Sequence, residues 1–436
     1  MSRLQNLLLV YPEVPSNTYW SYKYALRFAQ IRSAMPPLGL ITLASFIPEH
    51  YNLKLVDLNV TPLADEDIRW ADAVFISAML VQKDAFLKVV NTCNTHNTPV
   101  IAGGPYATTY YQNIIGVDHF VLGEVEDILH LFLADLQNNR ARKVYAADER
   151  PDISRAKPPR FDLLDLSAYS TMSIQYSRGC PFRCEFCDIW KVYGNRPRLK
   201  LAETVIRELD ALFKLGWRGT VFIVDDNFIG NKKRVKKELL PALVKWQKDH
   251  GHVYQFFTEA SINLADDPQL LAGMRDSGFT EVFIGIETPS AASLKETGKT
   301  QNLKTDLSRA VRTVQNFGIE VMAGFILGFD SDTADIFDRQ IDFIEENGIP
   351  RAMVGLLNAL PGTDLFDKLQ QEDRILGDCE GNNTHQMTTN FKTRMDAELL
   401  KEGYLKVIAT LYGTNLKNYF TRCSRLFDNL GDTAHY

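Results

Sequence analysis

Short apolar segments recur through the first third of the chain, and each has the length of one buried strand. Stretches with helical character separate most of them. Apolar strands that alternate with helices form parallel sheets covered on both faces, so the pattern predicts a doubly wound α/β domain over residues 1–145. The predicted strands are Asn6 to Tyr11, Leu53 to Leu58, Ala73 to Ser77, Pro99 to Ala102 and His119 to Leu122.

Small and turn-forming residues follow three of these strands. They are Ser77-Ala78-Met79, Gly103-Gly104-Pro105 and Gly123-Glu124. Ligands of doubly wound sheets bind beyond the carboxyl ends of the strands, and glycines there let the backbone approach a large ligand. Such glycines also form tight turns, so the segments taken alone leave both interpretations open.

Prolines and charged residues break the pattern at residues 146–168, which predicts a linker. Strands separated by helices then resume over residues 169–364. Six such units are too few for a closed eight-unit barrel, so a partial barrel is expected. The predicted strands are Met172 to Tyr176, Thr220 to Val224, Tyr254 to Thr258, Glu281 to Ile286, Glu320 to Leu327 and Ala352 to Leu357.

Residues 365–436 have apolar positions near helical spacing, which predicts a helical C-terminal domain. Its default role is packing, although a helical cap over a substrate cavity is an alternative.

Composition excludes several classes of function. Of 436 residues, 45% are hydrophobic and 23% charged, and the net charge of −6 comes without a long basic block, so no nucleic-acid partner is expected. The apolar run near the N-terminus is too short for a signal or a membrane span. We therefore expect a cytoplasmic protein without stable membrane insertion.

Polar residues follow several strands of the predicted barrel, where barrel enzymes place their chemistry. Asp225, Asp226 and Asn227 follow the second strand, Glu259 and Ser261 the third, and Glu287 the fourth. A residue such as Asp226 or Glu287 could instead cap the next helix.

Three cysteines have the spacing CxxxCxxC, at Cys180, Cys184 and Cys187. Three thiolates so spaced can bind three irons of a 4Fe-4S cluster and leave the fourth iron open. Structural zinc is the main alternative, but it needs a fourth ligand and the nearest downstream histidine is His250. A second alternative is that the three cysteines are only small hydrophobic side chains buried in the core.

The cysteine motif and the aromatic and charged run after it resemble the radical S-adenosylmethionine superfamily, whose fold is a six-unit partial barrel. The resemblance implies that the three cysteines bind the cluster and that the open iron binds S-adenosylmethionine. It also implies contacts to S-adenosylmethionine from Phe186, Asp225, Asp226, Asn227, Glu259, Ser261, Glu287, Gly324, Gly328 and Leu360.

The N-terminal pattern resembles the cobalamin-binding domain found ahead of the barrel in many of these enzymes. The DxHxxG motif, which supplies a histidine to cobalt in cobalamin mutases, is absent, so we expect cobalamin without a lower axial histidine. The resemblance implies cobalamin contacts from Pro37, Leu38, Gly39, Ser77, Met79, Gln82, Gly103, Gly104, Pro105, Gly123 and Glu124.

Further segments are similar to the group that contains the hopanoid C-2 methyltransferase, among them Val224 to Asn227, Thr258 to Ala265 and Val354 to Pro361. The resemblance implies a methyltransferase that acts on an unactivated carbon of a small-molecule or lipid substrate. Its cofactors would be a 4Fe-4S cluster, S-adenosylmethionine and cobalamin, with electrons from a donor such as flavodoxin or ferredoxin. No general acid or base is expected, because abstraction of a hydrogen atom from an aliphatic carbon needs none.

Two alternatives remain at this point. A cobalamin-dependent radical enzyme of the same kind could carry out a cyclisation, ring contraction or oxidation, and no motif separates it from a methyltransferase. A non-catalytic cobalamin or redox sensor is the other, but no output domain is apparent in the sequence.

Overall fold

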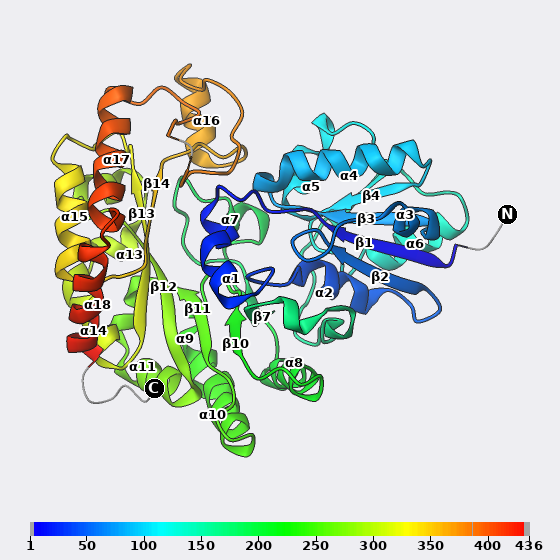
Figure 1. Ribbon diagram of the computed structural model, residues 1–436, viewed down its shortest axis with the longest axis horizontal. Helices are drawn as coiled ribbons and strands as arrows, with labels where there is room; N and C mark the ends of the chain where they lie inside the picture. Colours follow the sequence, from blue (N-terminus) through cyan, green and yellow to red (C-terminus); the bar gives the residue numbers. More distant parts are fainter. Residues whose placement is uncertain (1–3, 386, 431–436) are drawn as a thin grey trace. The chain divides into compact units, whose positions relative to one another are not determined.

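The computed structural model describes residues 4–385 and 387–430 (Figure 1). Contacts within the chain divide it into two compact units. Among the described residues, the first comprises 4–174 and 203–219, and the second comprises 175–202, 220–385 and 387–430.

The first unit contains a parallel sheet of six strands in the order β2-β1-β3-β4-β5-β6. Because strands are added first on one side of β1 and then on the other, the direction of winding changes between β1 and β3. Ligands of doubly wound sheets bind at this change of direction. The strands are β1 (Asn6–Tyr11), β2 (Asn52–Asp57), β3 (Ala73–Ser77), β4 (Val100–Gly103), β5 (His119–Leu122) and β6 (Val144–Ala146).

Both faces of this sheet are buried. Along β1, Leu8 and Val10 belong to one apolar core, while Leu7 and Leu9 belong to the other. Successive side chains of a strand point to opposite faces, so a continuous apolar run fits a strand covered on both sides. The helices of this unit are α1 (Lys23–Ala29), α2 (Leu38–Phe46), α3 (Asp65–Trp70), α4 (Lys83–Thr95), α5 (Gly104–Tyr110), α6 (Leu129–Gln137) and α8 (Ala202–Lys214).

A second sheet has the strand order β14-β13-β12-β11-β10-β7. The pairs from β10 to β14 are parallel. Its strands are β7 (Thr171–Ile174), β10 (Thr220–Ile223), β11 (Phe256–Ala260), β12 (Phe279–Glu287), β13 (Glu320–Leu327) and β14 (Ala352–Leu356), and β8 (Ser177–Arg178) and β9 (Arg198–Leu199) form a separate small ribbon.

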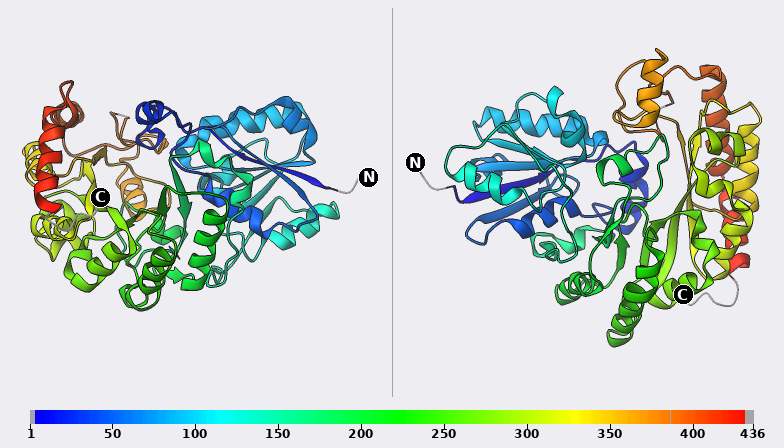
Figure 2. Two further views of the ribbon diagram at one scale, coloured as in Figure 1. Left: turned by 60° about the horizontal axis from the view of Figure 1, so that its bottom comes forward. Right: turned by 180° about the vertical axis from the view of Figure 1, so that it is seen from behind.

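Helices α14, α15, α17 and α18 cover one face of the second sheet (Figures 1 and 2). The fully buried Arg422 of α18 joins several of these elements. Its guanidinium group contacts the Glu345 carboxylate of α15 at 2.7 Å and the Leu411 carbonyl oxygen of α17 at 3.0 Å. The helices of the second unit are α7 (Ile189–Val192), α9 (Lys232–Arg234), α10 (Leu240–Asp249), α11 (Pro268–Ser277), α12 (Ala291–Glu296), α13 (Thr300–Leu303), α14 (Leu307–Asn316), α15 (Ile336–Glu346), α16 (Asp364–Gln371), α17 (Ala397–Tyr412) and α18 (Lys417–Leu430).

The predicted fold class is confirmed: a doubly wound N-terminal part, a six-stranded partial barrel and C-terminal helices. Several strands begin or end one or two residues away from their predicted bounds, and β11 shows one physical reason. Tyr254 precedes β11 instead of beginning it, because its ring stacks on Trp246 of α10 with ring centroids 5.0 Å apart. An apolar residue used for packing between a helix and a loop is thus mistaken for part of a strand.

Candidate active site

The three cysteines of the motif lie in the loop between β8 and α7. The backbone N–H of Cys180 donates to the Gly194 carbonyl at 3.2 Å, and the N–H of Cys187 donates to the Cys184 carbonyl at 3.2 Å. Gly179 has a φ of 98°, and a Cβ there would stand 2.7 Å from the Gly194 oxygen. Glycine is therefore required where the loop begins.

Two amide groups and one ammonium group surround these thiols, and none of the three thiols forms a disulfide. Asn227 Nδ2 donates to Cys180 Sγ, and Gln301 Nε2 donates to Cys184 Sγ, each at 3.9 Å. Burial raises the pKa of all three thiols, and the positive charge of Lys299 acts on each in the opposite direction. A metal that takes thiolate ligands must therefore displace protons when it binds.

These surroundings fit an iron-sulfur cluster. Among residues 4–385 and 387–430, no three His, Cys, Asp or Glu side chains are arranged to hold a single metal ion. A cube makes a different demand, because each cysteine binds a separate iron atom. Hydrogen bonds to sulfur and a nearby cation both stabilise an anionic thiolate cluster.

Two carboxylates after β10 shape the chain just ahead of the cysteines. Asp225 accepts hydrogen bonds from the Tyr176 N–H at 2.8 Å and from Ser177 Oγ at 2.6 Å. Asp226 accepts from the Gly179 N–H at 3.1 Å. Burial raises the pKa of Asp225 to about 7 and that of Asp226 to about 6.

Helix capping, the alternative role considered for Asp226 and Glu287, is wrong for both. Asn231 caps α9, and Ser290 caps α12, each with its own side chain. The carboxylates of Asp226 and Glu287 instead make other contacts: Asp226 accepts from the Gly179 N–H, and Glu287 pairs with Lys299.

The residues predicted after β11 extend the same group of polar side chains. Asn227 Nδ2 donates to Ser261 Oγ at 3.2 Å, and Ser261 Oγ donates to Asn263 Oδ1 at 2.7 Å. Glu259 is half-buried, and its burial, together with the negative charges of Asp226 and Asp225, raises its pKa to about 8. The structure thus brings the polar residues after β10 and β11 together.

Glu287, the last residue of β12, forms an ion pair with Lys299 at 2.5 Å. Its backbone has a φ of 67°, and the register of β12 against β13 shifts between Gly285 and Glu287. A non-glycine residue in this region costs energy and is concentrated at functional sites. The Lys299 Nζ also lies 6.0 Å from the ring centroid of Phe186.

The remaining residues predicted to contact S-adenosylmethionine lie along β13 and after β14. At Gly324 a Cβ would stand 2.9 Å from Phe283 Cζ, so this glycine makes room for a ring of β12. Gly328 has a φ of 102° and donates its N–H to Asp332 Oδ2 at 2.9 Å. The half-buried Leu360 lies in the loop ahead of α16.

In the first unit, the segment before α2 and the loop after β3 occupy the predicted cobalamin edge. Pro37 and Leu38 begin α2, and a Cβ at Gly39 would meet no atom within 4 Å. Met79 is 36% exposed, whereas Gln82 is fully buried. Gln82 accepts from the Met79 N–H at 2.8 Å and donates to the Pro12 carbonyl at 2.5 Å, so it joins the loops that follow β1 and β3.

The other residues predicted to contact cobalamin follow β4 and β5. Gly103 is tightly packed, since a Cβ there would lie 2.9 Å from the Val121 oxygen. Gly104 begins α5 with a φ of 79°, and Pro105 follows it. Gly123 donates its N–H to Thr108 Oγ1 at 3.0 Å, next to Glu124, and a Cβ on Gly123 would meet open space.

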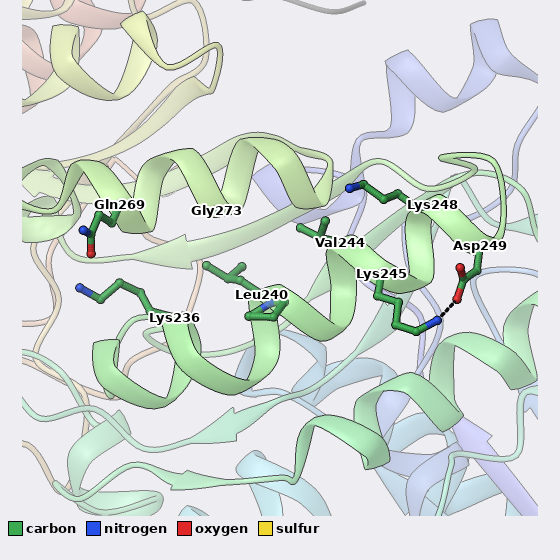
Figure 3. Close-up of a pocket in the computed structure, with 9 residues that line it drawn as sticks. Lys236, Leu240, Val244, Lys245, Lys248, Asp249, Gln269 and Gly273 are labelled. Atoms are coloured by element: carbon green, nitrogen blue, oxygen red, sulfur yellow. Dashed lines mark hydrogen bonds and ion pairs between the residues drawn. The ribbon is translucent and has the colours of Figure 1, made fainter.

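A groove of about 540 Å³ is lined mainly by residues of α10 and α11 in the second unit (Figure 3). Lys236 and Lys245 in its lining form ion pairs with Asp267 and Asp249. The groove contains none of the predicted site residues, so it is not a candidate for the active site.

Comparisons with known proteins assign both parts of the chain to families. A B12 binding domain matches residues 25–133, the Radical SAM superfamily matches residues 174–344, and a domain of unknown function, DUF4070, matches residues 363–436. An uncharacterized methyltransferase of Synechocystis sp. (strain PCC 6803) is 41% identical over 97% of this chain and 79% of its own length. The Hopanoid C-2 methylase of Rhodopseudomonas palustris (strain TIE-1) is 38% identical over 86% of this chain and 72% of its own.

The chain belongs to the cobalamin-binding radical S-adenosylmethionine enzymes. Within them it falls in the methyltransferase family of these two relatives. As a member of this family it is an enzyme whose cofactors are a 4Fe-4S cluster, S-adenosylmethionine and cobalamin. The fold agrees: the solved cobalamin-dependent S-adenosylmethionine radical enzyme OxsB superposes with a TM-score of 0.72 at 16% identity, covering 93% of this chain and 66% of that one.

The sequence analysis of this chain did not identify Lys299 and Gln301. In the structure, both lie beside the cysteine loop. Both follow α12 and not a strand, so a search of strand ends does not find them. It also missed Tyr169, whose hydroxyl donates to the buried Asp57 carboxylate at 3.0 Å in the first unit. Among the described residues, no helix is long and apolar enough to cross a membrane.

Proposed function

We propose that this enzyme transfers a methyl group to an unactivated carbon of a small-molecule or lipid substrate. The observation that carries the proposal is the 38% identity to the Hopanoid C-2 methylase over 86% of this chain, which is more than either unit alone could supply. The substrate is left as a class, because fold and family do not determine it.

For the cluster and S-adenosylmethionine, we propose the second unit. Cys180, Cys184 and Cys187 would each bind one iron. The polar residues after β10 and β11, with Glu287, would position S-adenosylmethionine, and Phe186, Gly324, Gly328 and Leu360 would line its apolar side. In this proposal Asp225 also holds the start of the cysteine loop in place, because it accepts two hydrogen bonds from the chain ahead of the cysteines.

For cobalamin, we propose the carboxyl edge of the first sheet. The open space at Gly39 and Gly123 and the exposed Met79 support this position. Gln82 is fully buried, so it would act by holding the loop after β3 and not by direct contact. No histidine is assigned to cobalt.

When bound, S-adenosylmethionine and the cluster supply a radical that removes hydrogen from the substrate, and cobalamin supplies the methyl group. The residues of the chain hold these groups and exclude water and competing hydrogen donors. Burial raises the pKa of Glu259 to about 8, so it can keep its proton at neutral pH and act as a neutral hydrogen-bonding group in the site. We assign no general acid or base.

The proposal includes a low-potential electron donor such as flavodoxin or ferredoxin and a cytoplasmic location. It also keeps the predicted division into residues 1–145, a linker of 146–168, a barrel of 169–364 and a helical region of 365–436.

The proposal is tested with full-length protein that is reconstituted anaerobically with iron, sulfide and hydroxocobalamin, so that every methyl group comes from S-adenosylmethionine. The protein is incubated with a reductant and S-adenosylmethionine that carries a deuterated methyl group, and lipid and polar cell extracts are added separately. Mass spectrometry should detect a product that carries the deuterated methyl group in one of the extracts. Formation of 5′-deoxyadenosine with no labelled product in either extract would instead favour the non-methylating radical enzyme.

A further inference from the structure

The segment Thr297–Asn302, which we name the bridging segment, connects two parts of the site. It runs from the end of α12 into α13.

On one side, the bridging segment contacts three consecutive residues of the cysteine loop, Cys184, Glu185 and Phe186. The Thr297 carbonyl oxygen accepts the N–H of Glu185 at 3.0 Å. Gln301 Nε2 donates to Cys184 Sγ at 3.9 Å, and the Lys299 ammonium lies over the Phe186 ring. The loop therefore meets a backbone acceptor, an amide donor and a cation, all from one short segment.

On the other side, the same segment holds the end of β12. Asn302 Nδ2 donates to the carbonyl oxygens of Gly285 at 3.1 Å and Ile286 at 2.9 Å. These contacts lie at the register shift that puts Glu287 in its left-handed conformation and its carboxylate on Lys299. The strained strand end and the cysteine loop are thus joined through the bridging segment.

The charge of this segment is buried. The side chain of Lys299 is 12% exposed and that of Glu287 is 10% exposed, while Gln301 is 8% exposed. A buried ion pair contributes little net stability compared with apolar side chains of similar size. Stability alone therefore does not explain why a lysine lies beside three thiols.

We infer that Lys299 and Gln301 are positioning residues that raise the reduction potential of the cluster bound by Cys180, Cys184 and Cys187. Reduction adds one electron, taken from an external low-potential donor, to a cluster that already carries the charge of three thiolates. A nearby cation and an N–H donor to sulfur stabilise the reduced form more than the oxidised form. The inference rests on the proposed cluster ligands.

The test compares full-length variants after anaerobic reconstitution, with iron and sulfide content measured first and the midpoint potential second. Lys299→Met should retain the cluster, and its reduction should be about tenfold less favourable, which is about 59 mV for one electron. Lys299→Arg should stay near the wild-type potential because it keeps the charge. Lys295→Met, which removes an exposed lysine from α12, is the matched control and should not change the potential.

The outcomes separate this inference from the proposed function. A Lys299→Met protein with a full cluster and the potential of the Lys295→Met control would overturn the inference, while the cluster assignment would stand. If Lys299→Met does not fold, Gln301→Leu decides: a full cluster at a lower potential supports the inference, and an unchanged potential contradicts it. A wild-type protein that binds no cluster would overturn both the inference and the ligands on which it rests.

Discussion

At the scale of single residues, the site contains several carboxyl groups whose pKa is strongly raised by burial. Glu259 is the clearest, with a pKa raised from an ordinary value of 4.5 to about 8. Because its pKa is higher in the folded than in the unfolded chain, Glu259 contributes stability below pH 4.5, and that contribution is lost as the pH rises through about 8.

We therefore predict that Glu259→Gln makes the unfolding free energy of the cofactor-free protein less dependent on pH. Between pH 5 and pH 8, the unfolding free energy of the variant should rise relative to that of the wild type by about 1–3 kcal/mol. This is less than the full pKa shift corresponds to, because the Glu259 side chain keeps some contact with solvent. Urea denaturation at both pH values measures this difference. Equal pH dependence of the two proteins would contradict the pKa shift.

The cysteines give a second prediction at this scale. Cys184→Ala should lose the charge-transfer absorption of the reconstituted cluster and most of its iron, because two thiolates do not hold a cube as three do. Cys423→Ala, which changes a cysteine of α18 outside the motif, serves as the control and should keep both. An intact cluster in Cys184→Ala would rule out this ligand set.

At the scale of elements, the sequence predicts strands well where an apolar run serves only the sheet. The predicted strand Asn6 to Tyr11 coincides with β1, because all of its central side chains enter the two cores. Packing outside the sheet is less predictable, as Tyr254 shows. The ends of strands also reveal Asp226 and Glu287 as candidates, since parallel strands gather their carboxyl ends at one edge.

The bridging segment marks the limit of such prediction. Its lysine and glutamine read as ordinary polar residues of a helix–loop connection, and only long-range contacts bring Gln301 to Cys184, 117 positions earlier in the chain. The sequence holds no local signal for such a contact.

The C-terminal helices provide a prediction at the scale of elements. Arg422→Ala should lower the unfolding free energy by about 3–5 kcal/mol, because it leaves Glu345 and several carbonyl oxygens without their buried partner. Arg425→Ala, one turn along on an exposed side of α18, should cost much less. Denaturant titration compares them, and similar losses in the two variants would show that Arg422 does not join the helices as described.

At the scale of the whole molecule, the chain divides into two units, and each carries the predicted residues for one set of cofactors. We expect the two sets to load independently. Gly39→Phe should weaken hydroxocobalamin binding at least about tenfold by filling the open space at α2, and it should leave the iron content unchanged. Cys184→Ala should show the reverse pattern.

Absorbance titration with hydroxocobalamin and iron analysis on the same samples check this prediction. Loss of the cluster in a folded Gly39→Phe protein would contradict independent loading. Unchanged cobalamin binding in that variant would move the cobalamin site away from α2.

The measurement that tests the central claim most directly follows the methyl group and the radical together. Once a substrate has been found, the reconstituted enzyme is given S-adenosylmethionine with a deuterated methyl group, and the product and 5′-deoxyadenosine are quantified in the same reaction. We predict equal amounts of the two, with the label on a carbon atom of the substrate and neither formed by Cys184→Ala. A product without the label, or one labelled on oxygen, nitrogen or sulfur, would contradict methyl transfer to carbon.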